Sequence, residues 1–201
     1  MNALPKVSRH QTGFSIIEVL VTLVIMLLGL LGLVGMMLLS QRAQMESYQR
    51  SQALILLQDM VERINANRKV ASCYAFTTAA DGTPYLGSGS SITTPTCTAG
   101  LAEQNARAIQ DMQDWHQLLL GSNEASGSGS SAINQGAMIG ARGCVTVDTT
   151  TTPPTYQVNV VWQGLGKTAA PPAAWSCASD QYGSDTQRRV VGATVRIAKL
   201  S

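Results

Sequence analysis

The chain has 201 residues, 45% of them hydrophobic, so its length predicts one small domain with appendages. The formal net charge of +2 equals the charge of Lys6 and Arg9, which precede a long apolar run. The other 12 basic side chains balance the 12 acidic ones, so no basic surface for nucleic acid is indicated.

The apolar run begins shortly after Lys6 and Arg9. The 21 positions from Val19 to Leu39 contain no charged residue and no proline. A helix of roughly 20 apolar residues crosses a bilayer core. The two cations ahead of it predict a cytoplasmic N-terminus, so the rest of the chain is expected in the periplasm. An ordinary secretory signal is not expected, because the run is too long and the small residue Gly13 precedes it.

From residue 13 the chain reads G-F-S-I-I-E-V-L-V-T-L. This segment closely resembles the class III signal of type IV prepilins and pseudopilins. The resemblance implies that a prepilin peptidase cleaves the Gly13–Phe14 bond, removes residues 1–13 and methylates the new amine of Phe14. Glu18 matches the family's glutamate. The alternative is an uncleaved signal anchor that carries a stray glutamate.

Glu18 has a physical rationale within this interpretation. A carboxylate at the centre of a membrane helix costs about 2.5–3.5 kcal/mol, and less near an interface. Glu18 lies near the cytoplasmic end, where the cost is tolerated. After cleavage, the cationic amine of Phe14 in a neighbouring subunit can pair with it. Such a pair is strong and register-specific in a low dielectric, so we expect Glu18 to dock parallel helices during assembly.

The helix is expected to continue beyond the apolar run, from Phe14 to about Ala66. Residues 41–68 contain neither glycine nor proline, and their apolar positions recur three and four residues apart. The predicted stripe is Leu54, Leu57, Met60, Val61 and Ile64. We expect this stripe to pack against a globular head.

The head begins with a loop-rich stretch over residues 71–100, followed by a predicted amphipathic helix over 101–121. One face of that helix carries Ile109, Met112, Trp115 and Leu119. His116, Asp111 and Asp114 are expected on its solvated side. Residues 122–140 are rich in Gly and Ser and predict a flexible loop.

Three strands are predicted after this loop, over residues 144–147, 155–163 and 189–200. The second places Tyr156, Val158, Val160 and Trp162 on one face, and the third places Val191, Ala193, Val195 and Ile197 on one face. This period of two predicts half-buried antiparallel strands. Arg188 and Arg189 begin the last strand, where edge solubility and partner contact both remain open. The predicted class is α+β, a long N-terminal hydrophobic helix packed on a small antiparallel sheet, as in the type IV pilin fold.

Four patterns in the head resemble the PilV family of minor pilins: D-M-x-x-W, C-V-T-V, Y-x-V-x-V-x-W and a late R-R-V-V. The resemblance implies a place in the minor-pilin complex that primes pilus assembly near the tip and supports attachment and twitching motility. The implied partners are other minor pilins, the major pilin, the prepilin peptidase and the inner-membrane assembly platform. A tip adhesin is a further candidate partner.

Four cysteines lie on the predicted periplasmic side: Cys73, Cys97, Cys144 and Cys177. Their wide spacing does not suggest zinc binding or redox catalysis, and an oxidising compartment favours disulfides. Four cysteines allow three connectivities. We favour Cys73–Cys97 and Cys144–Cys177, because each pair closes one loop-rich segment. No metal and no cofactor are predicted.

The expected domains are a leader (1–13), a transmembrane and filament-core helix (14–40), its amphipathic continuation (41–68) and a periplasmic or extracellular head (69–201). No catalytic arrangement is recognised, so an enzyme is not expected. Two alternatives stay open. A type II secretion pseudopilin shares the signal and the helix, and a membrane-anchored periplasmic enzyme requires that the leader be retained.

Overall fold

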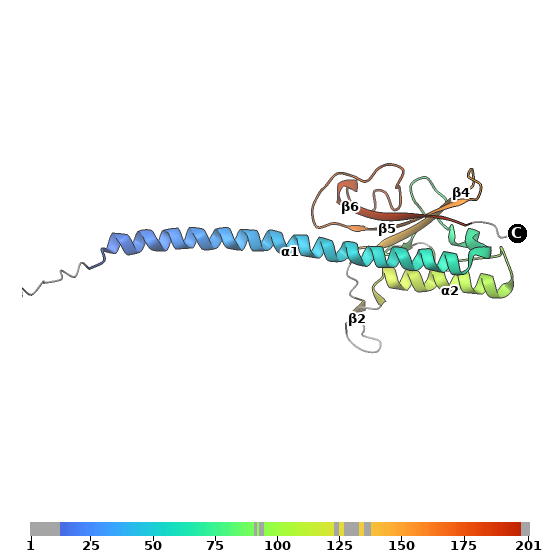
Figure 1. Ribbon diagram of the computed structural model, residues 1–201, viewed down its shortest axis with the longest axis horizontal. Helices are drawn as coiled ribbons and strands as arrows, with labels where there is room; N and C mark the ends of the chain where they lie inside the picture. Colours follow the sequence, from blue (N-terminus) through green and yellow to red (C-terminus); the bar gives the residue numbers. More distant parts are fainter. Residues whose placement is uncertain are drawn as a thin grey trace, which may run out of the picture. The chain divides into compact units, whose positions relative to one another are not determined.

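The computed structural model describes residues 13–90, 92, 95–122, 125–126, 133–134 and 138–197. The chain divides into two compact units, residues up to Ala43 and residues from Gln44 onward. One helix, α1 (Ile16–Ala66), supplies residues to both units. The second unit also holds the remaining helices and all the described strands (Figure 1).

The part of α1 in the second unit forms one wall of the core. Its buried residues recur every three or four positions: Gln49, Ala53, Leu57, Met60 and Ile64. The prediction was right at Leu57, Met60 and Ile64, whereas Leu54 is 42% exposed and Val61 is half-buried. Each helical residue turns about 100° from the last, so Leu54 faces away from the side that buries Ala53 and Leu57.

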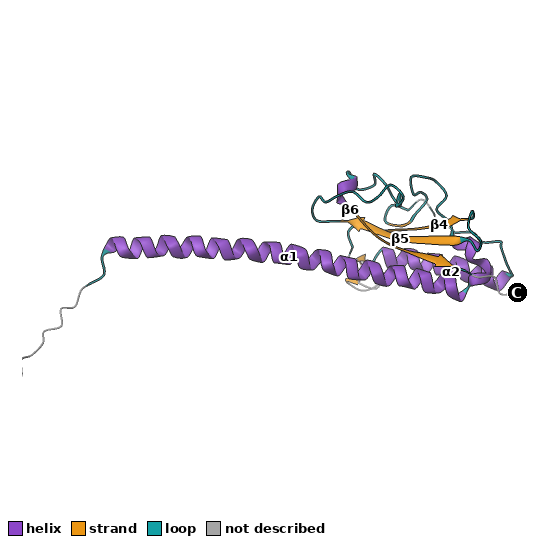
Figure 2. Cartoon of the chain, turned by 45° about the horizontal axis from the view of Figure 1, so that its top comes forward, coloured by secondary structure: helices purple, strands orange, loops and turns teal. Residues whose placement is uncertain are grey.

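After α1, a short 3-10 helix, η1 (Arg68–Tyr74), leads toward α2 (Ala102–Leu119). Helix α2 lies beside the C-terminal part of α1 in both ribbon views (Figures 1 and 2). The indole Nε1–H of Trp115 donates to the Leu56 carbonyl at 2.8 Å. Met112, Trp115 and Leu119 are buried as expected, and Ile109 is half-buried at the edge of that face.

The main sheet has four antiparallel strands in the order β1-β4-β5-β6. They are β1 (Leu86–Gly87), β4 (Arg142–Asp148), β5 (Thr155–Gln163) and β6 (Arg188–Arg196). A separate two-stranded sheet pairs β2 (Ala125–Ser126) with β3 (Ile133–Asn134). The three longer strands confirm the prediction. The three two-residue strands fall in stretches predicted as loops, because two residues are too few to show a period.

One face of the main sheet packs on the helices. Tyr156, Val158, Val160 and Trp162 of β5 belong to this core, as do Val191 and Val195 of β6. Gly143 on β4 lies directly against the ring of Trp115, and a Cβ built there would be 2.1 Å from a ring carbon. Glycine is therefore needed at 143 for the sheet to approach α2 this closely.

The other face of the sheet is also covered, by the segment between β5 and β6. Figure 2 shows α1 and α2 on one side of the strands and mostly loops on the other. Cys144, Val161 and Cys177 form a second small core with neighbours from these loops. Asn159 is only 4% exposed, so the prediction of a half-buried strand was wrong there. The alternating pattern cannot show that a loop of polar composition folds back over the polar face.

Candidate functional site

The N-terminal motif occupies the start of α1 in the first unit. Gly13, Phe14 and Ser15 precede the helix, which begins at Ile16, and the side chain of Phe14 is 85% exposed. The Gly13–Phe14 bond therefore lies in non-helical backbone on an exposed segment. A peptidase can reach a bond in such a position without unwinding a helix. The rest of the leader lies outside the described residues.

Glu18 lies in the first turn of α1. Its backbone N–H donates to the Ser15 carbonyl at 3.0 Å, and its side chain is exposed. A negative charge in the first turn is favoured by the helix dipole. No ion pair joins Glu18 to another residue within the described part of the chain. A single subunit thus presents this carboxylate outward, where an external cation can approach.

The helix surface that follows Glu18 is apolar and uncovered. Its large hydrophobic side chains range from 47% exposed at Val24 to 68% exposed at Leu31. Among the described helices, α1 is long and apolar enough to cross a membrane. An uncovered apolar surface of this extent needs a bilayer or neighbouring helices. Together with Glu18, this apolar surface suits the segment to anchoring in a bilayer and to packing against neighbouring helices.

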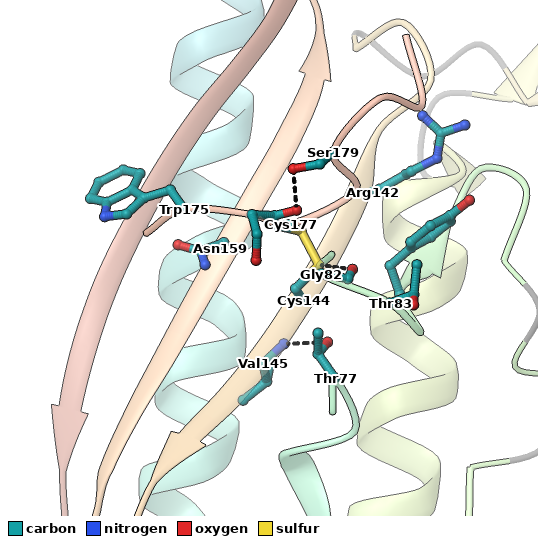
Figure 3. Close-up of a disulfide and its surroundings, with 12 residues drawn as sticks. Thr77, Gly82, Thr83, Arg142, Cys144, Val145, Asn159, Trp175, Cys177 and Ser179 are labelled. Carbon is teal, nitrogen blue, oxygen red and sulfur yellow. Dashed lines mark hydrogen bonds between the residues drawn. A yellow bond between two sulfur atoms is a disulfide. The ribbon is translucent and has the colours of Figure 1, made fainter. Parts of the chain in front are cut away.

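Two disulfides hold the head, with the pairing favoured from the sequence. Cys73 joins Cys97, and Cys144 joins Cys177, across 24 and 33 positions of sequence. The first links η1 to the segment before α2. The second fastens the loop between β5 and β6 onto β4 (Figure 3). Each bond is expected to contribute about 2–4 kcal/mol to head stability.

The same loop is held by a buried arginine. The side chain of Arg188 is 1% exposed and forms an ion pair of 2.6 Å with Asp185. It also donates to the carbonyls of Trp175 and Cys177, at 2.6 Å and 3.3 Å. The hydrogen bond from Arg188 holds the pKa of the Asp185 carboxyl below its usual value. The sequence left edge solubility and partner contact open for Arg188. The structure supports neither, because its guanidinium is buried and hydrogen-bonded inside the head.

Asp111 is the acceptor of a buried network between α1 and α2. Its side chain is 2% exposed and lies 3.0 Å from both Arg63 and Arg107. The hydroxyl of Tyr74 donates to it at 2.6 Å. Burial, followed by this hydrogen bond, raises the pKa of Tyr74. The expectation that Asp111 is solvated was wrong, whereas Asp114 is 47% exposed. The spacing could have shown this, since Asp111 lies three and four positions from buried Ala108 and Trp115.

His116 is also more enclosed than the sequence suggested. It is half-buried, and its Nδ1 accepts a hydrogen bond of 3.0 Å from the backbone N–H of Gly87. Burial lowers the pKa of its imidazole. Its contact with β1 is structural, because it ties α2 to the edge of the sheet. In the residues that the structure describes, no cluster of three or more His, Cys, Asp or Glu side chains could hold a metal ion.

Comparison with known families agrees with these features. Residues 8–34 match the prokaryotic N-terminal methylation motif. The long apolar helix and the small antiparallel sheet match the type IV pilin fold, and this match adds the prepilin N-terminal methylation motif. The particular family profile that the chain matches, over residues 35–112, is the Tt1218-like one, described as Type IV pilin Tt1218. No curated protein and no solved structure matches the chain.

Proposed function

We propose that this type IV pilin is a minor pilin of the PilV kind, part of the complex that primes pilus assembly near the tip. The observation that carries the proposal is the segment from Gly13 to Glu18, ahead of an uncovered apolar helix. The head patterns that resemble PilV supply the finer assignment. In this proposal the subunit supports attachment and twitching motility, and it has no enzymatic activity.

The subunit first spans the inner membrane, with its leader in the cytoplasm and its head in the periplasm. The prepilin peptidase cleaves after Gly13 and methylates the amine of Phe14. The assembly platform then moves the subunit into the fibre, where Glu18 pairs with the N-terminal amine of a neighbour. An unpaired charge in the apolar filament core is costly, so this pairing selects one register. The partners in the fibre are other minor pilins, the major pilin and a tip adhesin.

The head patterns that resemble PilV contribute buried residues. Asp111 and Trp115 of D-M-x-x-W, together with Val158 and Trp162 of Y-x-V-x-V-x-W, are buried. They shape the core of the head rather than its contact surfaces. The resemblance to PilV therefore supports a shared head architecture, and the tip location depends on residues outside these patterns.

Intact-mass measurement tests the proposal on protein purified from membranes and from sheared pili. We expect a chain that begins at methylated Phe14 and is present in the sheared fibres in small amounts relative to the major pilin. A processed chain found in membranes alone would indicate a type II secretion pseudopilin. A chain that retains Met1 would contradict the processing of Gly13 and revive the membrane-anchored enzyme.

A further inference from the structure

A small cavity lies in the second unit between α1 and the sheet, where β5 ends and β6 begins. Its volume is about 280 Å³. Three of its residues come from α1 and three from the two strands: Glu46, Ser47, Arg50, Trp162, Arg189 and Val190. The first three lie shortly after the apolar segment in the sequence. The lining therefore combines the beginning of the head part of α1 with one end of the sheet.

Some of the charged side chains that line this cavity have partners and one does not. Arg189 pairs with Glu46 at 3.0 Å and also donates to Thr168 and to the Gly166 carbonyl, at 2.7 Å and 2.9 Å. Arg50 is exposed and has no hydrogen bond or ion pair with any residue in the described ranges. Two arginines against one glutamate leave the lining with a net charge of +1. The cavity thus has one cation to offer to an anion.

A second donor in the lining has no partner either. The side chain of Trp162 is part of the cavity wall, the residue is only 3% exposed, and its Nε1–H has no acceptor. A buried donor without a partner costs about 1–3 kcal/mol, so an acceptor at this position is favourable. Gln49 carries another orphan atom, its Oε1, but it is outside the cavity lining and is not assigned to a ligand.

The position of the cavity along the chain indicates where the anion comes from. Ser47 and Arg50 follow Leu39, the end of the uncharged run, by eight and eleven residues. In a helix this is about 12–17 Å of rise. The headgroup layer on one side of a bilayer is about 5–8 Å thick, and charges act over a Debye length of about 8 Å. For a helix along the membrane normal, this rise places Ser47 and Arg50 about 4–12 Å beyond the headgroup layer, so a charge there acts on lipid phosphates over about one Debye length.

We propose that this cavity binds the phosphate of an anionic phospholipid headgroup while the subunit is in the membrane. The Arg50 guanidinium and the Trp162 Nε1–H are its donors, and Ser47 adds a hydroxyl at the rim. Exposed Met45 and Tyr48, at 51% and 49%, flank these residues on α1 with the aromatic and apolar character of an interfacial belt. The inference rests on the membrane-anchored stage of the proposed function.

The test uses the full chain in lipid nanodiscs and the three indole N–H signals of ¹⁵N-labelled tryptophan. Trp162→Phe identifies the Trp162 signal. We expect this signal to move when phosphatidylglycerol replaces part of the phosphatidylcholine, while the signals of Trp115 and Trp175 stay in place. Arg50→Gln should abolish the movement. The matched control is Arg68→Gln at the start of η1, another exposed arginine without an ion pair among the described residues.

Four outcomes would overturn the inference. The first is a Trp162 signal that is the same in both lipids, and the second is an equal loss of movement in Arg68→Gln. The third is full reproduction of the movement by inorganic phosphate in neutral discs, which would identify a free anion as the ligand. The fourth is a movement that depends on the number of protein copies per disc, which would identify another pilin as the occupant.

Failure of this inference is distinguishable from failure of the proposed function. If Arg50→Gln is processed and enters sheared pili normally while native protein shows no lipid response, the lipid site alone is wrong. If the native chain retains residues 1–13 or does not insert into discs, the anchored minor pilin is wrong and the lipid site is overturned with it.

Discussion

The two units of this chain use apolar residues in opposite ways. In the first unit, the large hydrophobic side chains of α1 are exposed, from 47% at Val24 to 87% at Ile16. In the second, α1 buries Leu57 to 4% and Met60 to 0% exposure against the sheet and α2. The same helix therefore changes from an uncovered apolar surface to one wall of the head core. We therefore expect substitutions in the first unit to affect assembly and those in the second to affect stability.

The largest expected effect tests the first half of this comparison. Glu18→Ala should still be cleaved after Gly13 but should be strongly depleted from sheared pili, because the amine of a neighbouring subunit loses its counter-ion. The measurement is the ratio of processed protein in fibres to that in membranes. Glu62→Ala, which removes another exposed glutamate from α1, is the control and should assemble normally. Normal incorporation of Glu18→Ala would disprove the docking role.

The next effect tests the second half. Asp111→Ala should lower the free energy of unfolding of the head by about 3–5 kcal/mol, because Arg63 and Tyr74 lose a buried acceptor. Urea unfolding of the full chain in detergent, followed by head fluorescence, measures it. Asp114→Ala removes a carboxylate that is 47% exposed and should cost less than about 1 kcal/mol. Equal losses in the two variants would show that Asp111 is not the centre of the network.

Two leucines in the head part of α1 test whether stability depends on burial against the sheet and α2. Leu57→Ala should cost about 2–5 kcal/mol, since Leu57 is 4% exposed. Leu54→Ala should change stability by about 0.5 kcal/mol or less, because this side chain is 42% exposed. The same unfolding assay applies. A large cost at Leu54 would restore the stripe first predicted from the sequence.

The smallest effect is a dependence on pH. Burial lowers the pKa of His116, so the unfolded chain binds a proton more readily than the folded one. Stability should therefore fall as the pH drops below about 6.5, the ordinary value for histidine. His116→Asn keeps a side-chain acceptor near Gly87 and should flatten this slope between pH 7 and 5. Melting temperatures at the two pH values measure it, and an unchanged slope would contradict the assignment to His116.

Much of the fold could be predicted because its signals are local. The period of β5 and the apolar face of α2 around Trp115 depend on residues a few positions apart. The buried charges depend on partners far away in the chain, such as Tyr74, which is 37 positions from Asp111. A charged residue considered without its partners is predicted to be exposed, so the burial of Arg188 was also missed. The processing motif was recognisable because its residues are contiguous.

The disulfides limit how far the head can be stretched if it is pulled within the proposed fibre. Cys144–Cys177 and Cys73–Cys97 close rings with sequence separations of 33 and 24 residues. A stretched chain extends by about 3.3–3.6 Å per residue, so the two rings withhold about 110 Å and 80 Å of contour length from a pulling force. The first ring includes all of β5, so that strand remains within the covalent loop even if the sheet is torn open. Under load, the head can therefore release only the contour length that lies outside the two rings.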